Sequence, residues 1–586
     1  MYILGISCFY HDSAATLVKD GMVVAASQEE RFSRKKHDTG FPTQSVEYCL
    51  ASQGIKIKDI NYIAFYEKPF LKFERLLHQH IASYPKSYKV FLSNMPSWFN
   101  EKLRVMKNIK KKLKYEGDVL FIEHHLAHAA SSFLPSPYQK AAIVTADGVG
   151  EWTTTAYGIG DKNKITLLKE IQFPTSIGLL YSTITAYLGF SVNNSEYKVM
   201  GLAAYGNMDP KTNHYYEKLM SIIDVKKDGS YRFNMDYFDY SFKNRMPSKR
   251  LCGLLGGPIR QAEGELTKRH NDIAAAVQLV TEELMTNILN HVQEETKCDS
   301  VVLSGGVALN SVYNGKILSK TKFKRVWIQP DPGDGGTSMG AALYAYNCIL
   351  DNKRNYILAD AYLGPEYKNE EIKKFLEENK IKYTEFSTDD ELIKKTASLI
   401  FNNNVVGWFQ KRMEWGPRAL GARSILSNPT NRQMQEILNL KVKHREKFRP
   451  FAPVVCADDA LKYFECDDPL PEITDFMLMV YPIREKWRQK IPAVTHRDGS
   501  GRLQTVKRPQ HPMYYDLIKS FGRLSGVPIL INTSFNIRGE PIVCSPLDAY
   551  RCMMGTGIDY LSIGRFIVSR QDNLKDAWDS EKLAKD

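Results

Sequence analysis

The feature that most constrains the fold is a pattern of short strands and tight turns that occurs twice. Residues 3–32 read ILGISCFYHDSAATLVKDGMVVAASQEERF. Their β-branched runs, broken by a polar turn and an Asp-Gly turn, predict a meander of strands. Residues 141–171, AAIVTADGVGEWTTTAYGIGDKNKITLLKEI, repeat the same order. We interpret the pair as an internal duplication, which predicts an α/β protein with two related lobes.

Two later segments each place a glycine-rich turn between an apolar strand and a helix. They are residues 300–319, SVVLSGGVALNSVYNGKILS, and residues 325–346, RVWIQPDPGDGGTSMGAALYAY. Backbone amides at such helix starts suit phosphate or ribose oxygens, but neither segment fits the Rossmann or P-loop motif. Either turn alone would be a structural turn, whereas together with the duplicated meanders they favour a bound nucleotide. The arrangement resembles the actin-like (ASKHA) ATPase and sugar-kinase fold, a duplicated ribonuclease H-like fold.

The length predicts more than one domain, because 586 residues exceed what one hydrophobic core usually supports. A polar segment at 351–365 separates a first domain, residues 1–355, from a second α/β domain, residues 360–572. We expect residues 573–586 to form a charged surface tail. Within the second domain the pattern predicts amphipathic helices and buried strands. The helices are expected at 369–381 and 389–404, and the strands at 405–410, 452–457 and 527–535.

Composition indicates a cytoplasmic protein without a membrane partner. No signal peptide and no run of 18 apolar residues is found. The nine cysteines are scattered and never form CxxC, which favours free thiols in a reducing compartment. Part of the net charge of +13 falls in residues 105–117, VMKNIKKKLKYEG, which we interpret as a solvated helix face. Contact with nucleic acid or an acidic partner is the less favoured alternative for this segment, and we expect no nucleic acid partner.

The stretch EHHLAH predicts a metal site. His124 and His128 are four residues apart, so a helix would place both imidazoles on one face. The zincin motif HExxH would need glutamate at position 125, which is histidine here, so the metallopeptidase interpretation fails. Asp147 and Asp334, each expected at the end of a strand, would complete a set that suits iron, manganese or zinc.

Basic residues in the second domain alternate with Trp, Phe, Gly and Pro. Buried guanidinium groups are costly unless an anion meets them, so these clusters predict a phosphate-bearing ligand. The clustered residues are Lys411, Arg412, Arg418, Arg423, Lys443, Arg445, Arg449, Asn532, Ser534 and Arg538. In the first domain His11, in FYHDSAA, is either a general base or a turn histidine bonded to the backbone.

Taken together, the motifs resemble the O-carbamoyltransferase family that includes nodulation protein U and the cephamycin, novobiocin and tobramycin carbamoyltransferases. The resemblance covers residues 1 to about 570. It rests on FYHDSAA, EERFSRKKHD, EHHLAHAASSF, DGVGEW, EYKVMGLAAYG, LSGGVALN, DPGDGGTSMGAA, WGPRALGARSIL, REKFRPFAP and NTSFNIRGEPIV.

The resemblance implies a YrdC-like second domain that makes carbamoyl-adenylate from carbamoyl phosphate and ATP, with Mg²⁺ accompanying the ATP. Arg418, Lys443 and Arg449 would be catalytic there. The residues that would bind carbamoyl phosphate are Arg418, Lys443, Arg449, Ser534, Asn532 and Arg538. A free adenylate would hydrolyse, so we expect a shielded path to the second reaction.

The first domain would resemble the tRNA threonylcarbamoyl transferases and pass the carbamoyl group to a hydroxyl of a small molecule. A metal on His124, His128, Asp147 and Asp334 would hold the adenylate, with Fe²⁺ favoured over Mn²⁺ or Zn²⁺. His11 would deprotonate the acceptor. The expected nucleotide-binding residues are Lys198, Gly201, Gly305, Gly306, Asn310 and Gly335, and the expected acceptor-binding residues are Asp12 and Glu151.

Two other classes of function stay open at this point. One is a tRNA-modifying or RNA-binding protein, which the basic charge would suit; the other is an actin-like ATPase or sugar kinase, which would form ADP instead of AMP and pyrophosphate. The acceptor cannot be read from the sequence, although residues 65–118 and 207–262 are where its specificity is expected. A homodimer is the expected assembly.

Overall fold

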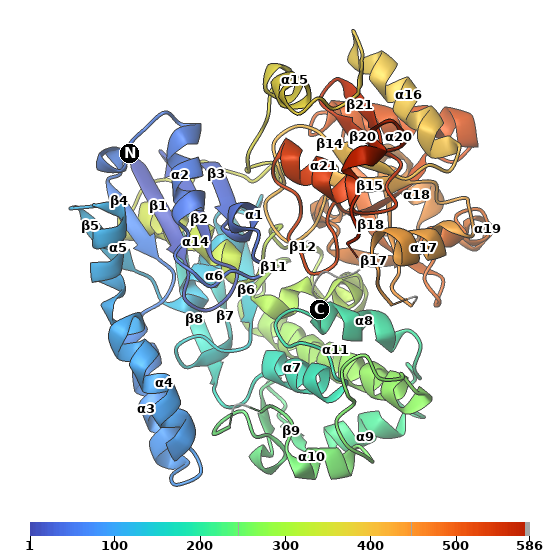
Figure 1. Cartoon of the computed structure of the whole chain (residues 1–586). Helices are drawn as coiled ribbons and strands as arrows, with labels where there is room; N and C mark the ends of the chain where they lie inside the picture. Colours follow the sequence, from blue (N-terminus) through green and yellow to red (C-terminus); the bar gives the residue numbers. More distant parts are fainter. Residues whose placement is uncertain (244, 447, 581–586) are drawn as a thin grey trace. The chain divides into compact units, whose positions relative to one another are not determined.

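The protein is described by a computed structural model covering residues 1–243, 245–446 and 448–580. The chain divides into two compact units (Figure 1). The first unit comprises Met1–Glu29 and Thr39–Leu358, and the second comprises Glu30–Asp38 and the chain from Ala359 onward. The chain therefore enters the second unit early, leaves it, and returns to it later.

The first unit begins with a mixed five-stranded sheet in the order β3-β2-β1-β4-β5. β1, β2 and β3 are antiparallel neighbours, whereas β4 and β5 extend the sheet in parallel with β1. An Asp20-Gly21 turn joins β2 to β3, as the sequence predicts. The strands are β1 (Tyr2–Ser7), β2 (Ala14–Lys19), β3 (Met22–Gln28), β4 (Tyr62–Phe65) and β5 (Asp118–Phe121).

A second five-stranded sheet in this unit has the same topology, in the order β8-β7-β6-β11-β12. Again a meander of antiparallel strands comes first, and two later strands run parallel to its first strand. The repeated order is that of the duplicated ribonuclease H-like, actin-like fold and confirms the predicted duplication. The strands are β6 (Lys140–Ala146), β7 (Thr153–Asp161), β8 (Lys164–Gln172), β11 (Ser300–Ser304) and β12 (Arg325–Trp327).

Two helices occupy the space between these sheets. α14 (Thr337–Tyr344) packs on β1, β2 and β4, and α6 (His124–Phe133) packs on β6 and β11. The two helices approach closely at Gly340, where an added Cβ would lie 1.8 Å from the carbonyl oxygen of Ala127. Gly5 of β1 makes a similar approach to the carbonyl oxygen of Ser338. Glycine at these positions lets helix and sheet backbones meet.

The remaining helices cover the outer faces of the first unit. The long helix α11 packs against α7, α8 and α9, and the pair α3 and α4 extends away from the first sheet (Figure 1). The bounds are α2 (Thr43–Ser52), α3 (Pro69–Ala82), α4 (Tyr88–Asn100), α5 (Val105–Leu113), α7 (Ile177–Tyr187), α8 (Glu196–Ala203), α9 (His214–Met220), α10 (Lys249–Leu254), α11 (Lys268–Thr296), α12 (Ser311–Asn314) and α13 (Ile317–Lys320). A two-stranded sheet adds β9 (Ile223–Val225) and β10 (Tyr231–Phe233).

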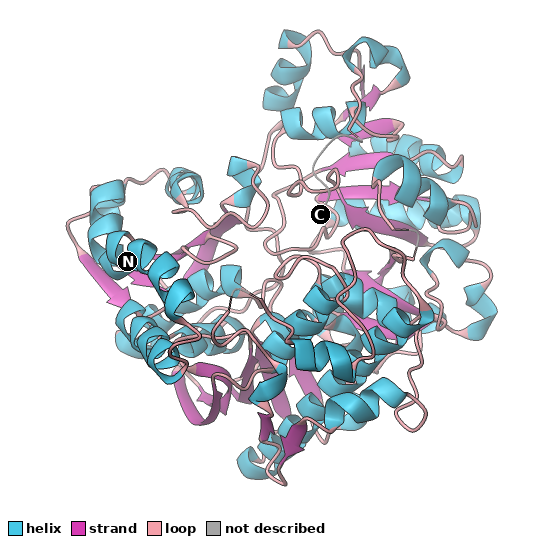
Figure 2. Cartoon of the chain, turned by 60° about the horizontal axis from the view of Figure 1, so that its bottom comes forward, coloured by secondary structure: helices cyan, strands magenta, loops and turns pink. Residues whose placement is uncertain are grey.

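The second unit is built on a mixed nine-stranded sheet (Figure 2). Its order is β13-β21-β20-β14-β15-β19-β16-β18-β17. The predicted strands at 405–410, 452–457 and 527–535 appear as β14, β16 and β19. The strands are β13 (Thr384–Glu385), β14 (Val406–Phe409), β15 (Arg423–Ser427), β16 (Ala452–Cys456), β17 (Met479–Pro482), β18 (Ser500–Val506), β19 (Ile529–Ser534), β20 (Tyr560–Ile563) and β21 (Phe566–Ser569).

Helices α16 and α20 pack together on this sheet, where buried Leu392, Trp408 and Leu517 share one apolar cluster. Both amphipathic helices predicted from the sequence are present, as α15 and α16. The helix bounds are α1 (Glu30–Ser33), α15 (Asn369–Glu378), α16 (Asp389–Phe401), α17 (Met434–Ile437), α18 (Ala460–Tyr463), α19 (Glu485–Arg488), α20 (Pro512–Ser525) and α21 (Pro546–Met554).

The early segment Glu30–Asp38 is bonded into the second unit. Arg31 Nη2 donates a hydrogen bond to the carbonyl oxygen of Gly416 at 2.8 Å. Arg34 donates to the carbonyl oxygens of Pro541 and Ile542 at 2.8 and 2.7 Å. The sequence prediction assigned this segment to the first domain, because nothing in its residues shows which core it joins.

The described residues of the predicted surface tail, 573–580, are mostly exposed, but two of them are buried. Asn573 is fully buried, and its side chain bonds to the backbone of Lys382 and Ser569. Ser580 is 3% exposed. Residues 581–586 of the predicted tail lie outside the described residues. Within the described ranges, each helix is too short or too polar to traverse a lipid bilayer.

Candidate functional site

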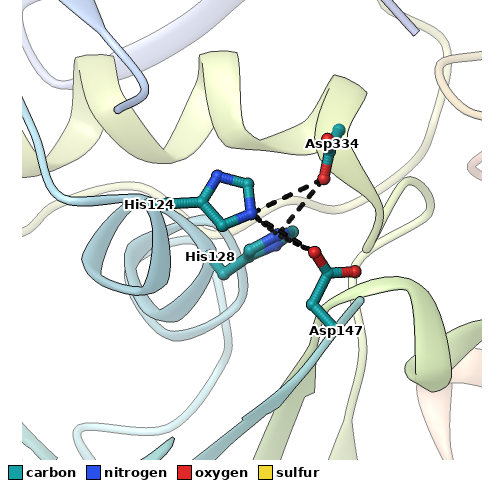
Figure 3. Close-up of side chains that lie close together, drawn as sticks. All are labelled: His124, His128, Asp147 and Asp334. Carbon is teal, nitrogen blue, oxygen red and sulfur yellow. Dashed lines mark hydrogen bonds and ion pairs between the residues drawn. The ribbon is translucent and has the colours of Figure 1, made fainter. Parts of the chain in front are cut away.

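The first unit brings together the four residues that the sequence predicted as metal ligands. His124 and His128 come from the first turns of α6, Asp147 follows β6, and Asp334 lies in a 3₁₀ turn that leads into α14 (Figure 3). One ligand atom from each lies within 4.8 Å of all the others. The four side chains could therefore hold one divalent metal ion.

The ring nitrogens and carboxylate oxygens of the four residues lie close together. His124 Nε2 lies 3.3 Å from Asp147 Oδ2 and 3.1 Å from His128 Nε2. His128 Nε2 lies 3.5 Å from Asp334 Oδ1. The set of two imidazoles and two carboxylates suits iron, manganese or zinc, and the chemistry of the donors does not choose among them.

Neighbouring groups orient these ligands. Ser304 Oγ lies 3.2 Å from His128 Nδ1, which leaves Nε2 turned toward the carboxylates. The Gly306 amide donates a hydrogen bond to Asp147 Oδ1 at 2.9 Å, so the other oxygen faces the histidines. Asp334 Oδ1 is buried without a hydrogen-bond partner. A buried carboxylate oxygen that no donor meets is costly, and a bound cation would satisfy it.

The histidines and aspartates of this cluster shift one another's pKa values. Burial alone would lower the pKa of His124, but its hydrogen bond to Asp147 and the charge of Asp334 outweigh burial and raise it. Burial would raise the pKa of Asp147, yet the hydrogen bond from His124 and the charge of His128 hold it well below its usual range. The lowered pKa of Asp147 favours the anionic carboxylate that can bind a metal, whereas His124 must lose its proton before its ring nitrogen can act as a ligand.

Asp334 differs from the predicted position. The sequence placed it at the end of a strand, but β12 ends at Trp327 and Asp334 begins the 3₁₀ turn Asp334–Gly336. The intervening residues form a loop that carries the carboxylate to the histidines. The pattern of small residues predicted the helix α14 correctly but could not locate the end of the short strand.

His11 lies beside this cluster. Its Nε2 is 3.6 Å from Asp334 Oδ2, and its Nδ1 is 2.8 Å from Asp12 Oδ2. Burial would lower the pKa of His11, but the charge of Asp334 and the hydrogen bond to Asp12 raise it well above its ordinary value. Asp12, which the sequence predicted to contact an acceptor, therefore orients the imidazole and makes it a stronger base.

Glu151, the other predicted acceptor residue, bonds to backbone amides. Its carboxylate accepts hydrogen bonds from the His124 amide at 3.0 and 3.1 Å and from the Lys68 amide at 2.8 Å. It is 7% exposed, and burial raises its pKa. Glu151 thus fixes the start of α6, the turn that carries His124.

The glycines of the predicted nucleotide turns lie next to the metal ligands. Gly305 has φ of +92°, and an added Cβ would lie 2.2 Å from the carbonyl oxygen of Ala146. Gly306 bonds to Asp147, and Gly335 follows Asp334 directly. At Gly335 an added Cβ would lie 2.3 Å from Asp331 Oδ2. The segment after β11, predicted as one helix, is instead broken into short helical pieces including α12 and α13.

Three predicted nucleotide residues have other neighbours. Asn310 forms a reciprocal pair with Gln278 of α11, at 3.0 and 3.1 Å, and caps α12. Lys198 is 2% exposed and its Nζ lies 5.6 Å from the centre of the Phe190 ring. Gly201 lies on the same helix, α8. None of these contacts involves a metal ligand.

In the second unit Lys443 and Ser534 meet. Lys443 Nζ donates hydrogen bonds to the Ser534 carbonyl oxygen, to Ser534 Oγ at 3.3 Å and to Asn536 Oδ1 at 2.7 Å. Lys443 is 4% exposed, and burial together with the charges of Arg445 and Arg449 lowers its pKa well below the ordinary value. A buried ammonium among other cations is suited to binding an anion.

Arg502 of β18 is a candidate that the sequence reasoning missed. Its Nε is buried without a hydrogen-bond partner. Burial and the charges of Arg418 and Arg449, both predicted ligand residues, lower its pKa well below the ordinary value. The three guanidinium groups therefore repel one another until an anion joins them. The sequence feature that could have identified Arg502 as a candidate is its place as the single arginine in the strand SGRLQTV.

Other basic residues of the predicted clusters bond to groups of the protein itself. Arg538 Nη1 donates to the His444 carbonyl oxygen at 3.0 Å, and its Nη2 lies 3.9 Å from Glu446 Oε1. Arg423 is fully buried and donates to carbonyl oxygens, including those of Gln410 and Pro365.

Arg412 likewise donates to the carbonyl oxygens of Gly364 and Leu363. Because carbonyl oxygens already meet the guanidinium groups of Arg412 and Arg423, the placement of these two residues does not by itself require an anionic ligand. Asn532, 1% exposed, donates to the Ala419 carbonyl oxygen at 2.9 Å and to Gln504 Oε1.

Comparison with known protein families gives two matches that cover most of the chain. The family model described as the carbamoyltransferase N-terminus matches residues 2–343. The model described as the carbamoyltransferase C-terminus matches residues 397–570.

Relatives match along nearly the whole length. An uncharacterized protein of Synechocystis is 47% identical over 97% of both chains. Nodulation protein NolNO of Sinorhizobium fredii is 35% identical over 97% of this chain and 80% of its own. Nodulation protein U of the same species is 26% identical over 92% of this chain and 94% of its own.

Solved structures with a similar arrangement are more distant. HypF of T. kodakarensis shares 14% identity over 60% of this chain and 48% of its own, with a TM-score of 0.32. The ROK hexokinase of Thermus thermophilus shares 13% identity over 59% of this chain and 98% of its own, with a TM-score of 0.29.

Proposed function

This chain belongs to the carbamoyltransferase family, and on that premise we propose that it is an ATP-dependent O-carbamoyltransferase acting on a small hydroxylated molecule. The second unit would form carbamoyl-adenylate, and the first unit would transfer the carbamoyl group to the acceptor. The observation that supports this division is a cluster of two histidines and two aspartates in one unit and a group of buried cationic side chains in the other.

The donor reaction consumes carbamoyl phosphate and ATP. Hydrolysis of the P–O bond of carbamoyl phosphate gives carbamate and inorganic phosphate. A carbamate oxygen then attacks the α-phosphorus of ATP, which forms carbamoyl-adenylate and releases pyrophosphate. Arg418, Arg449 and Arg502 would stabilise the phosphate charges, and Lys443 would bind phosphate oxygens as a cation.

Ser534, Asn532 and Arg538 would complete the carbamoyl phosphate site. Ser534 supports this role through its contact with Lys443. Arg538 already bonds to the backbone of His444, next to Lys443, so it would act by holding that loop. Asn532 bonds to the backbone of Ala419, so it would position the loop that contains Arg418.

In the transfer reaction the acceptor oxygen attacks the carbamoyl carbon, and the bond from that carbon to the AMP phosphate oxygen breaks. His11 would accept the hydroxyl proton, and its position beside Asp334, with Nδ1 held 2.8 Å from Asp12 Oδ2, supports this role. His124, His128, Asp147 and Asp334 would hold a divalent metal, for which we propose Fe²⁺ before Mn²⁺ or Zn²⁺. Such an ion supplies positive charge that stabilises the nucleotide phosphate.

The nucleotide would lie against the glycine turns next to the metal ligands. The backbone at Gly305, Gly306 and Gly335 is free of Cβ atoms and would approach the phosphate or ribose. Lys198, Gly201 and Asn310 are proposed as more distant nucleotide contacts.

The test is to mix the purified protein with ATP, carbamoyl phosphate, Mg²⁺ and Fe²⁺ without acceptor and to measure pyrophosphate and AMP. We expect pyrophosphate release that depends on carbamoyl phosphate, is lost in Arg449→Ala and persists in His11→Ala. ADP as the product would instead indicate a kinase or ATPase. Pyrophosphate release without carbamoyl phosphate would also refute the proposal.

A further inference from the structure

A buried guanidinium without a hydrogen-bond partner lies on α3, over the ring of Phe173. Arg75, in the second turn of α3, is 7% exposed, and its Nε has no hydrogen-bond partner. In the parts of the chain that the structure describes, no ion pair or hydrogen bond reaches its guanidinium group. Burial lowers the pKa of Arg75 to about 10, and the charges of Tyr10, Glu67 and Glu151 offset only part of that effect.

This situation differs from that of Arg354, a largely buried arginine of the same unit. Arg354 Nε donates to the Leu134 carbonyl oxygen at 2.6 Å, Nη1 donates to that of Tyr138 at 2.5 Å, and Nη2 donates to that of Ser136. Arg354 therefore has a structural role that its contacts explain. An unpaired buried charge contributes no such contacts and costs stability, which is typical of residues kept for a ligand.

The charged groups around Arg75 are paired with other groups, whereas the guanidinium of Arg75 is not. Lys72, one turn earlier on α3, is paired with Glu67 at 2.5 Å. Both oxygens of Glu151 accept hydrogen bonds from backbone amides. The guanidinium carbon of Arg75 lies 5.1 Å from the centre of the Phe173 ring. A guanidinium stacked on an aromatic face with its N–H groups unused is well suited to a carboxylate, sulfate or phosphate group.

The groups whose charges act on Arg75 are linked by contacts to the proposed base. The ammonium of Lys72 lies 5.0 Å from the centre of the Tyr10 ring, and that ring lies 4.5 Å from the imidazole of His11. Glu151, whose charge acts on Arg75, also holds the amide of His124. Arg75 thus belongs to the surroundings of His11 and the metal ligands.

We propose that Arg75 binds an anionic group of the acceptor, so that the molecule carbamoylated here carries a carboxylate, sulfate or phosphate ester besides its reacting hydroxyl. The identification of the ligand as an acceptor rests on the proposed function, but the anion site itself does not. Arg75 and His11 would fix the acceptor at two points, which orients the hydroxyl toward the base.

The test measures thermal unfolding of the full chain, which needs no activity. An Arg449→Ala background weakens the proposed anion site of the second unit. In that background, sodium sulfate is compared with sodium chloride at equal ionic strength, for Arg75→Met, Arg75→Lys and the matched control Arg354→Met. We expect Arg75→Met to raise the Tm in chloride by about 2 °C or more, because it removes an unpaired buried charge.

Sulfate should raise the Tm of the parent and of Arg75→Lys, which both carry a cation at this position, more than that of Arg75→Met. Arg354→Met should lower the Tm in both salts and keep the sulfate response. An Arg75→Met variant that is less stable than the parent, or that fails to fold, would show a structural role and overturn the proposal. An equal rise in Tm with sulfate in the parent and in Arg75→Met would also overturn the proposal.

A second measurement links the site to the reaction. Hydroxy acids and their methyl esters are compared as acceptors, and we expect the parent to favour the acids at least about 10-fold in kcat/KM, a preference lost in Arg75→Met. Pyrophosphate release without acceptor should be unchanged in that variant. Failure of pyrophosphate release in the parent would refute the proposed function, whereas the sulfate response would still decide the anion site.

Discussion

The side chains of the proposed metal site come from three elements of the first unit, so a single side chain can be removed while the others remain in place. His124 and His128 share α6, whereas Asp147 and Asp334 arrive on a strand end and a 3₁₀ turn. His125, between the two histidines, points elsewhere and bonds to Thr145 Oγ1 at 2.7 Å. Burial and the two flanking histidines lower the pKa of His125 well below its ordinary value. It is therefore a matched control on the same helix.

We expect His128→Ala to lose bound metal, with affinity falling at least about 10-fold, because one of four ligand-type groups is removed. Metal content after dialysis against limiting Fe²⁺, measured by mass spectrometry, checks this. His125→Gln should keep the metal. Equal loss in both variants would mean that the effect comes from disturbing α6.

Arg502 allows a test in the second unit. We expect Arg502→Ala to abolish pyrophosphate release without lowering stability, since the side chain is repelled by Arg418 and Arg449 when no anion is bound. Arg423→Ala should instead destabilise the unit by about 3 kcal/mol, because it strands several buried carbonyl oxygens. Denaturant unfolding and the pyrophosphate assay separate the two cases. A destabilised Arg502→Ala would contradict the assignment.

The lowered pKa of Lys443 predicts proton uptake on ligand binding. Between the lowered pKa and the ordinary value near 10.4, the free protein has a partly neutral Lys443, and a bound anion restores the charge. Binding of carbamoyl phosphate should therefore take up as much as about one proton and weaken as pH rises through the lowered pKa.

Stability of the unliganded unit should rise with pH across the same window, because the unfolded state binds more protons there. Calorimetry in buffers of different ionisation enthalpy measures the uptake. Lys443→Met should show none, and uptake that persists in this variant would place the proton on another group.

At the scale of elements, the close approach of α6 and α14 holds the ligand-bearing turns together. Gly340 makes that approach possible, since its missing Cβ leaves room for the Ala127 carbonyl oxygen. The same two helices lie between the two sheets, so their spacing also sets the separation of the lobes' inner faces. A small change in that spacing should move Asp334 relative to His124 and His128.

We expect Gly340→Ala to destabilise the first unit by about 1–3 kcal/mol and to reduce bound metal, because the helices must separate. Gly253→Ala is the control: this exposed glycine of α10 has nothing within 4 Å of an added Cβ. It should gain about 0.5–1 kcal/mol of stability from helix propensity. Unchanged metal content in Gly340→Ala would show that the cluster tolerates the shift.

Sequence patterns predicted the elements well where local residues decide the outcome. The β-branched runs and the Asp20-Gly21 turn specify the first meander, and the spacing of His124 and His128 requires a helix. The features that sequence patterns could not predict depend on contacts between residues far apart in the chain. Arg412, Arg418 and Arg423 look alike in KRMEWGPRALGAR, but only tertiary structure shows that two of them bond to carbonyl oxygens. The same holds for Arg502, a lone arginine in a strand.

At the scale of the whole molecule, the proposed reaction needs both units of one chain. The family models match both parts, and each unit carries its own set of charged residues. A carbamoyl-adenylate that left the protein would hydrolyse in water, so the two half-reactions should be efficient only within one molecule.

A mixture of Arg449→Ala and His128→Ala proteins tests this. Each variant lacks one half-reaction, and we expect the mixture to transfer carbamoyl groups at less than about a tenth of the parent rate. Product formation is followed by mass spectrometry of the acceptor. Recovery of the parent rate would mean that free adenylate carries the carbamoyl group from one molecule to another.

The placement of Glu30–Asp38 in the second unit has a consequence for biosynthesis. Arg34 is translated 508 positions before Ile542, the residue whose carbonyl oxygen it binds. At ribosomal speeds that interval lasts roughly 25 to 100 s. Phe32 ends packed against Met413 and Cys544, which are translated 381 and 512 positions after it. The segment Glu30–Asp38 must therefore wait on the nascent chain, exposed to chaperones and proteases, until the rest of the unit that it joins has been translated.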